Sequence, residues 1–413
     1  MLFHSAIRGA QDGQWGRRWW PAHGALLAGL WLLVQTGLLL YYRGPRYAAD
    51  SWRYLEYAGS VAQHGYYKFA DPNDRFVYEH GQRYLVYILF QSFWLGLGAG
   101  WWGIVLGQVL ASGLAARALY GALRQLAGGR TGAAALATGL FILWPDIQRF
   151  NCFLLTESLF ISLSVLAFAA LVQVWAGGGR AAWLGLGLVL GLTLLARPNG
   201  FVVAAAAGVA GLAQLAQRPG RRLFWTAVGL LTLAVPLLLG ALNQQLNTFF
   251  IVETYARGEL MFGARAWAQH PAAALQLPPA GLGQVPRVLY FAAHNPEFLL
   301  QLMLGKLFVF ASGLKPQYSR LHCLANALVL WPAYWLAARG ARRPDVWLPA
   351  RAFLLAVPLL QAGVVMLTVD DWDVRFLAPV LPFVFGLAAL GAARGLAARF
   401  PTPPPGAGVP AGR

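Results

Sequence analysis

Apolar runs of about 20 residues recur along most of the chain, and they constrain its fold more than any other feature. An α-helix needs a run of this length to cross the hydrocarbon core of a bilayer. The composition agrees, because 58% of the 413 residues are hydrophobic and only 11% are charged. No stretch between the runs is long enough for a separate soluble domain. We therefore expect residues 1–413 to form a single all-α polytopic membrane domain.

The runs predict about ten transmembrane helices. Arg17 and Arg18 precede the first run, which is too long for a cleaved signal peptide, so we interpret it as an uncleaved span with a cytoplasmic amino terminus. The expected spans are 23–42, 101–124, 133–144, 153–174, 181–196, 201–215, 223–242, 321–338, 348–369 and 376–398. Both termini then lie inside, and the Pro/Gly-rich residues 400–413 are expected to form a disordered cytoplasmic tail.

Two longer segments, 43–100 and 243–320, fall on the external side of this topology. In the first, Asp50 begins an amphipathic helical pattern that Gly65 should end, and residues 84–98 are apolar but short enough for a helix at the interface. In the second, repeated prolines exclude one continuous helix. We expect juxtamembrane helices in both segments.

The acidic residues are distributed unevenly in this topology. All of them except Asp12 and Asp345 fall on the external side. Acidic residues contribute little to orientation, so their position indicates a polar external face that holds a charged substrate. The net charge of +17 follows from topology and from contact with anionic lipid. No nucleic-acid motif accompanies it, so we expect a membrane-lipid partner and no nucleic acid.

Cysteine and histidine give no indication of a bound metal. Cys152 and Cys323 have neither disulfide nor metal-ligand spacing, and the histidines also lack ligand spacing. We therefore predict no metal-ligating residues and assign no cofactor. The sequence leaves open whether the reaction requires a divalent metal.

Three short motifs follow one another along the chain after the early external acid: NCFLLTESLF, LLARPNGF and WDVRFLAPVLPF. In their order and in their common side of the membrane, these motifs resemble those of the GT-C superfamily of polytopic glycosyltransferases. The branches that look most similar are the protein O-mannosyltransferases and the lipid A aminoarabinose transferases. The resemblance implies a GT-C-like fold and transfer of a sugar from a polyprenyl-phosphate carrier.

The resemblance also implies roles for particular residues. Asp50 matches the catalytic acid of the first loop, and Glu157 matches the acid of the fourth span. Arg197 matches the Arg before Pro, and Arg375 matches the Arg of the last external turn. The chain departs from the family pattern in two ways: the first loop has ADS in place of a doubled acid, and the segment before Tyr84 lacks prolines.

The chemistry of such a transfer limits what the protein must supply. A polyprenyl-phosphate sugar already carries a good leaving group, so the reaction needs a base for the acceptor and cations for the departing phosphate. We assign Asp50 as the base of an inverting transfer. The predicted substrate-binding residues are Glu157, Arg197, Asn199, Lys306 and Arg375, of which the three basic residues are expected to converge on the donor phosphate.

Each assignment has an ordinary alternative. Asp50 is a favoured residue type for capping a helix, Glu157 is placed to hydrogen-bond the nearby turn WPDIQRFN, and basic residues at span ends often serve as interfacial anchors. At the level of function, a transporter of lipid-linked or anionic substrate, a non-enzymatic envelope scaffold, and a lipid-linked glycan polymerase or ligase stay open.

The expected location is the bacterial inner membrane, with the active site facing the periplasm or exterior. The acceptor can be a glycan, a lipid or a protein.

Overall fold

The computed structural model describes residues 22–48, 50–66, 83–218, 220–246, 250–279, 281–371 and 373–393. Regular structure in these ranges is helical, with two isolated β-bridges, Arg46 to Phe153 and Met261 to Asp370. Helices in the first half are α2 (Ala22–Tyr42), α3 (Ser51–His64), α5 (Leu85–Gly96), α6 (Gly100–Leu126), α7 (Thr131–Leu143), α8 (Pro145–Gln148), the 3₁₀ turn η2 (Arg149–Cys152) and α9 (Glu157–Trp175). The second half contains α10 (Arg180–Ala196), α11 (Gly200–Ala216), α12 (Arg222–Leu246), α13 (Ile251–Ala256), the 3₁₀ turn η3 (Arg265–Trp267), α14 (Gln284–His294), α15 (Pro296–Ser312), α16 (Arg320–Ala341), α17 (Leu348–Leu367) and α18 (Leu381–Ala392).

Every span expected from the sequence corresponds to a helix, but the helices differ in length. Six of the described helices are long and apolar enough to cross a membrane: α2, α6, α9, α12, α16 and α17. The other expected spans correspond to shorter apolar helices, α7, α10, α11 and α18. The chain is therefore an all-helical integral membrane protein, and six rather than ten of its described helices have the length of a full span.

Two helices begin later than their apolar runs predicted. The run expected to start at 153 becomes helical at Glu157, because η2 and a short turn precede it. The run expected to start at 376 becomes helical at Leu381, after consecutive turns and with Pro382 in its first turn. Proline fits the first turn of a helix because the backbone N–H groups there have no intrahelical partner.

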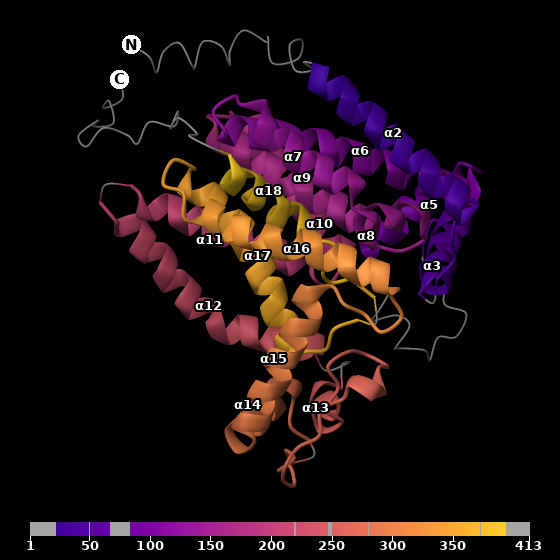
Figure 1. The fold of residues 1–413 in the computed structure, drawn as a ribbon. Helices are drawn as coiled ribbons and strands as arrows, with labels where there is room; N and C mark the ends of the chain where they lie inside the picture. Colours follow the sequence, from indigo (N-terminus) through magenta and orange to yellow (C-terminus); the bar gives the residue numbers. More distant parts are fainter. Residues whose placement is uncertain are drawn as a thin grey trace.

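The centre of the bundle is a continuous apolar core built by α6, α7, α9, α16, α17 and α18 (Figure 1). In α18 every residue from Leu381 to Gly391 is buried. Glycine allows α18 to pack very closely on α16: a side chain at Gly391 would meet the carbonyl oxygen of Leu336 at 2.0 Å, and one at Gly340 would meet that of Leu387 at 2.1 Å. The central helices therefore form a closely packed unit.

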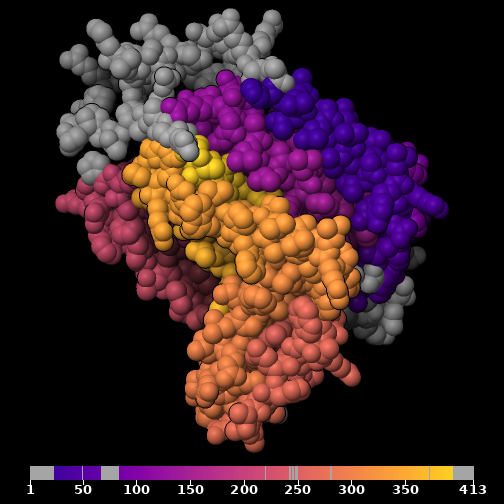
Figure 2. Space-filling model, in the orientation of Figure 1, coloured from indigo at the N-terminus to yellow at the C-terminus, as the bar shows by residue number. Residues whose placement is uncertain are grey.

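Helices α13, α14 and α15 project from one end of this bundle, as Figures 1 and 2 show. We call the described part of residues 250–315 the projecting lobe. It has its own apolar core, in which Tyr255 and Phe291 are fully buried. The prolines of this segment lie where expected, in loops or in the first turns of α14 and α15.

Helix α3 in the first expected external segment agrees with its sequence pattern. Tyr54 and Ala58 are buried on its inner face, and Gly65 ends the helix with φ of 73°. A left-handed residue after the last turn is the usual role of glycine at this position. The expected interfacial helix corresponds to α5. Residues 67–82 of the segment and the predicted tail at 400–413 lie outside the described residues.

Candidate active site

The site is built on the polar turn that joins α7 to α9. Gln148 and Asn151 of this turn are buried and interlock with Gln35 of α2: Gln35 Nε2 donates to Gln148 Oε1 at 2.8 Å, and Asn151 Nδ2 donates to Gln35 Oε1 at 2.9 Å. From α6, Ser112 donates to Gln148, and Gln108 donates to the carbonyl oxygen of Asn151 at 3.0 Å. Satisfied buried amides of this kind rigidify the backbone. The turn therefore holds the start of α9 in a fixed position.

Glu157, the first residue of α9, is fully buried and accepts hydrogen bonds from two guanidinium groups. Arg197 Nη1 lies 2.8 Å from Glu157 Oε1, and Arg375 Nε also donates to Oε1. The amino-terminal end of a helix adds a favourable potential for a carboxylate. These partners explain how a buried acid is kept charged.

Arg375 connects this buried acid to the first external segment. Its Nη1 lies 2.7 Å from Asp50 Oδ2 and 3.8 Å from Asp371 Oδ2. Burial lowers the pKa of Arg375, but the carboxylates of Glu157, Asp371 and Asp50 raise it more, so this side chain stays protonated.

Asp50 is the most exposed member of this group, with 33% of its side chain accessible against 14% for Arg375. It directly precedes α3, yet its side chain makes no capping hydrogen bond. The helix-capping alternative does not describe its contacts, because the carboxylate points to Arg375 instead.

The structure thus brings Asp50, Glu157, Arg197 and Arg375 together, although the pairs are separated by up to 325 positions in the sequence. We call these four residues and Asp371 the central ion cluster. Asn199 lies beside it and donates to Gln361 of α17 at 3.3 Å.

Lys306 is not placed in this cluster. Its Nζ donates to the carbonyl oxygen of Thr368 and lies 4.5 Å from the centre of the Tyr255 ring. The expectation that Lys306 joins Arg197 and Arg375 is therefore not met by the contacts of the described residues. Helix α15, which carries Lys306, packs this side chain inward at the base of the projecting lobe.

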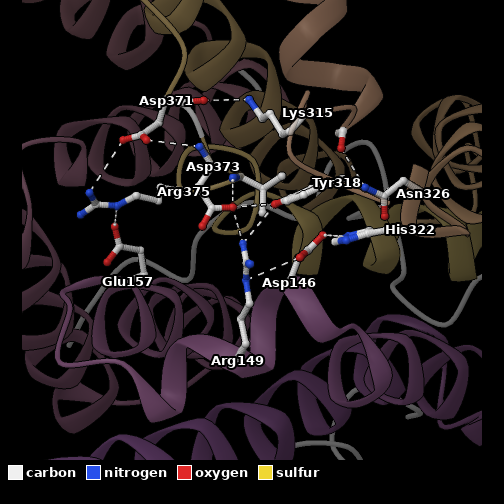
Figure 3. Close-up of polar contacts among 12 residues, drawn as sticks. Asp146, Arg149, Glu157, Lys315, Tyr318, His322, Asn326, Asp371, Asp373 and Arg375 are labelled. Atoms are coloured by element: carbon white, nitrogen blue, oxygen red, sulfur yellow. Dashed lines mark hydrogen bonds and ion pairs between the residues drawn. The ribbon is translucent and has the colours of Figure 1, made fainter. Parts of the chain in front are cut away.

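A second group of charges, which we call the lateral ion cluster, adjoins the first (Figure 3). Asp373 Oδ1 accepts from Arg149 and from the Tyr318 hydroxyl, and His322 Nε2 lies 3.0 Å from Asp146 Oδ2. The Tyr318 and His322 rings are stacked, with centres 3.9 Å apart. The two clusters are linked because the backbone N–H of Asp373 donates to Asp371 Oδ1 at 3.3 Å.

No sequence pattern predicted a role for this lateral cluster. Its charged residues are visible in the sequence, in the WPDIQRFN turn and in the acidic run before Arg375, but no spacing rule predicts that these two segments meet.

All the members of both clusters lie at or near helix ends. Glu157 begins α9, Arg197 follows α10, and the acidic segment 370–373 follows α17. Because Glu157 contacts both Arg197 and Arg375, and Arg375 also lies near Asp371, these three helix ends belong to one side of the bundle. The described residues contain no group of three or more His, Cys, Asp or Glu arranged to hold a metal ion.

These observations define a polytopic helical membrane protein with a partly exposed ion cluster at one side of its bundle. No protein-family model and no curated protein matches the chain. Among solved structures, it is similar to ArnT from Cupriavidus metallidurans bound to undecaprenyl phosphate, with 16% identity and a TM-score of 0.49 over 90% of this chain and 60% of that chain. The apo state of the same protein gives 16% identity and a TM-score of 0.46, over 89% and 59%. The chain spans about 60% of the length of these structures.

Proposed function

We propose that this protein is a membrane glycosyltransferase that moves a sugar from a polyprenyl-phosphate carrier to an acceptor at the external, periplasmic face of a bacterial inner membrane. The observation that supports it is the convergence of Asp50 with Arg375, Arg197 and Glu157 through direct ion pairs. A partly exposed carboxylate beside guanidinium groups at a bundle end is the combination that the chemistry needs.

In this proposal Asp50 is the general base. It takes the proton of the acceptor hydroxyl or amine as that group attacks the anomeric carbon, and the bond to the carrier phosphate breaks with inversion. Arg375 donates to Oδ2 of Asp50. We assign the other carboxylate oxygen, Oδ1, to the acceptor. Its greater exposure favours Asp50 over the fully buried Glu157 for this role.

Arg375 and Arg197 stabilise the departing phosphate. Each guanidinium group has five N–H donors. The contacts with the carboxylates use Nε and Nη1 of Arg375 and Nη1 of Arg197. The Nη2 groups are therefore the donors that we assign to the carrier phosphate, and Glu157 acts by orienting both side chains. Asn199, two residues after Arg197, is assigned to the same substrate-binding surface.

The positions of the charges favour a transferase over a transporter. A transporter usually places its substrate and ion sites near the bilayer midplane, at interruptions within helices. Here the ion clusters lie at helix ends. This position suits a lipid carrier, which presents its phosphate at the membrane surface.

The decisive experiment combines lipid analysis with one substitution. We expect mass spectrometry of the purified protein to detect a polyprenyl-phosphate sugar, and this lipid then serves as the donor in a transfer assay. Asp50→Asn keeps the side-chain volume and leaves Arg375 paired with Glu157. It should retain the donor and lose transfer by about 100-fold or more, the scale of a removed general base.

A matched control is Asp345→Asn, which removes another acid that pairs with an arginine, Arg343. This control should leave transfer unchanged, because Asp345 precedes α17 and the site follows its other end. Near-normal turnover by a folded Asp50→Asn protein would reject Asp50 as the base. Failure to bind or use any polyprenyl-phosphate sugar would reject the enzyme class.

A further inference from the structure

The short segment 367–371 connects α17 to the acidic and basic groups of the ion clusters, and side chains of the projecting lobe hold it from several directions. The Tyr255 hydroxyl donates to the carbonyl oxygen of Leu367 at 2.5 Å, and Lys306 donates to that of Thr368. The backbone N–H of Phe262 donates to the carbonyl oxygen of Asp370 at 2.8 Å. These donors come from α13, α15 and the loop after α13.

Lys315 adds contacts at the end of the same segment. Its ammonium group pairs with the Asp370 carboxylate at 2.5 Å and donates to the carbonyl oxygen of Asp371 at 2.9 Å. Both charged groups of this pair are buried, with 1% and 2% of their side chains exposed. We call the donors from Tyr255, Phe262, Lys306 and Lys315 the clamp.

The clamp matches the electrostatics of a helix end. The last carbonyl groups of a helix have no intrahelical donor and carry the negative end of its dipole. Leu367 is the last residue of α17, and Thr368 is its C-cap. A lysine amino group and a tyrosine hydroxyl on these two oxygens therefore replace the missing donors. This explains how Lys306 is fully buried although its contacts are a carbonyl oxygen and an aromatic ring rather than a carboxylate.

The residues that follow the clamp are those of the candidate active site. Asp371 ends the held segment, and Asp373 and Arg375 follow it within four positions. Arg375 bridges Glu157 and Asp50. A displacement of segment 367–371 would be passed along this short stretch to Arg375.

We infer that Tyr255, Lys306 and Lys315 are positioning residues, which tie the projecting lobe to α17 and thereby set the place of Arg375 in the site. This inference rests on the proposed function. It replaces the phosphate-binding role expected for Lys306 by a role that acts through the backbone of Thr368.

The test uses the whole chain and two variants that remove one clamp donor each. Tyr255→Phe keeps the buried ring and removes only the hydroxyl, and Lys306→Met keeps the length of the side chain and removes the ammonium. Hydrogen exchange of peptides covering 361–375 reports on the clamp without any substrate. We expect exchange to rise about 5-fold in each variant, which corresponds to the loss of one typical hydrogen bond.

Transfer assays then separate positioning from direct binding. In both variants we expect kcat to fall about 10-fold, the scale of a misplaced catalytic geometry. Any change in KM for the donor should be the same in the two variants, because both act through Arg375. Tyr334→Phe is the matched control, because Tyr334 also donates its hydroxyl to a backbone carbonyl, that of Ala311, at 2.8 Å. The control should change neither exchange at 361–375 nor kcat.

Three other results have distinct meanings. Unchanged exchange and unchanged kcat in both variants would overturn the inference. A raised donor KM in Lys306→Met alone would also overturn it, because that pattern identifies Lys306 as a direct ligand of the donor. If hydrogen exchange is faster in both variants but the wild-type protein transfers no sugar, the clamp is supported and the proposed function is rejected.

Discussion

The Glu157 carboxylate is fully buried, and its position depends on Arg197 and Arg375 together. Removing one partner of a buried ion pair leaves an uncompensated charge and typically destabilises a protein by about 3–5 kcal/mol. With two guanidinium groups on one carboxylate, Glu157 fixes the distance between its cations before any substrate arrives. Its role in the proposed reaction is therefore preorganisation, while Asp50 is left accessible.

Lys306 leads to a prediction about pH. Burial lowers the pKa of Lys306 from the usual 10.5 to about 7, an effect that the negative charge of Glu259 partly opposes. Between these two values the unfolded chain binds a proton that the folded protein does not, so stability rises with pH across this window. The upper limit of the slope for one such group is about 1.4 kcal/mol per pH unit.

We therefore expect thermal unfolding of the wild type to shift to higher temperature between pH 7 and pH 9, relative to Lys306→Met measured over the same range. The side-by-side comparison cancels the titration of other groups. Parallel curves for the two proteins would show that Lys306 stays charged in the folded state.

The sequence identified several of these residues but not their partners. Glu157 and Arg375 stand out because an ionisable group beside an apolar run is costly and is rare unless it has a functional role. Their contact joins positions separated by 218 residues, and no local pattern encodes such a pair. Lys306 shows the opposite case: it was identified as a basic residue of the second external segment, but its orientation toward the end of α17 depends on the packing of the lobe.

Among the helices, α16 and α18 make the closest contact. Replacing Gly340 or Gly391 by Ala places a methyl carbon against backbone oxygen of the facing helix, at 2.1 Å and 2.0 Å. Backbone atoms cannot move aside as a flexible side chain can, so the two helices must separate. Overpacking of this kind typically destabilises by about 1–3 kcal/mol.

We expect Gly340→Ala and Gly391→Ala to lower the unfolding temperature in detergent. Gly363→Ala is the control, since a side chain at this position of α17 meets nothing within 4 Å. A control that is destabilised as much as the two variants would indicate a general effect of the added methyl group and not a close helix contact.

The helices themselves follow from the sequence. In lipid the backbone N–H and C=O groups of each apolar run have no water to bind, so they must pair within the run, and an α-helix does this. Helix ends were less predictable. The starts of α9 and α18 are set by turns whose contacts come from elsewhere, as when Gln108 of α6 binds the backbone of the turn before α9. The glycines of the α16–α18 contact also had no pattern that would identify their partners.

At the scale of the molecule, the acidic residues separate the two sides of the bundle. Asp345 lies just before α17 and Asp370 just after it, at opposite ends of a helix of 20 residues, about 30 Å long. The described acids of the ion clusters and of the projecting lobe belong to the Asp370 end. The linkers between α11 and α12 and between α16 and α17 carry arginines at the other end.

The last prediction is the orientation of the whole molecule in the membrane. Arginines concentrated in short linkers mark the cytoplasmic side, so the ion clusters and the projecting lobe should face outward. Single cysteines in a background without Cys152 and Cys323 test this in intact cells. Gln63→Cys in α3 and Ala273→Cys in the lobe are exposed positions that should react with an impermeant thiol reagent. Ala176→Cys, exposed at the end of α9, should react only after the cells are opened. Labelling of Ala176→Cys alone in intact cells would place the site in the cytoplasm, where nucleotide sugars are available and a lipid carrier is not needed, and would remove the main reason for a polyprenyl-phosphate donor.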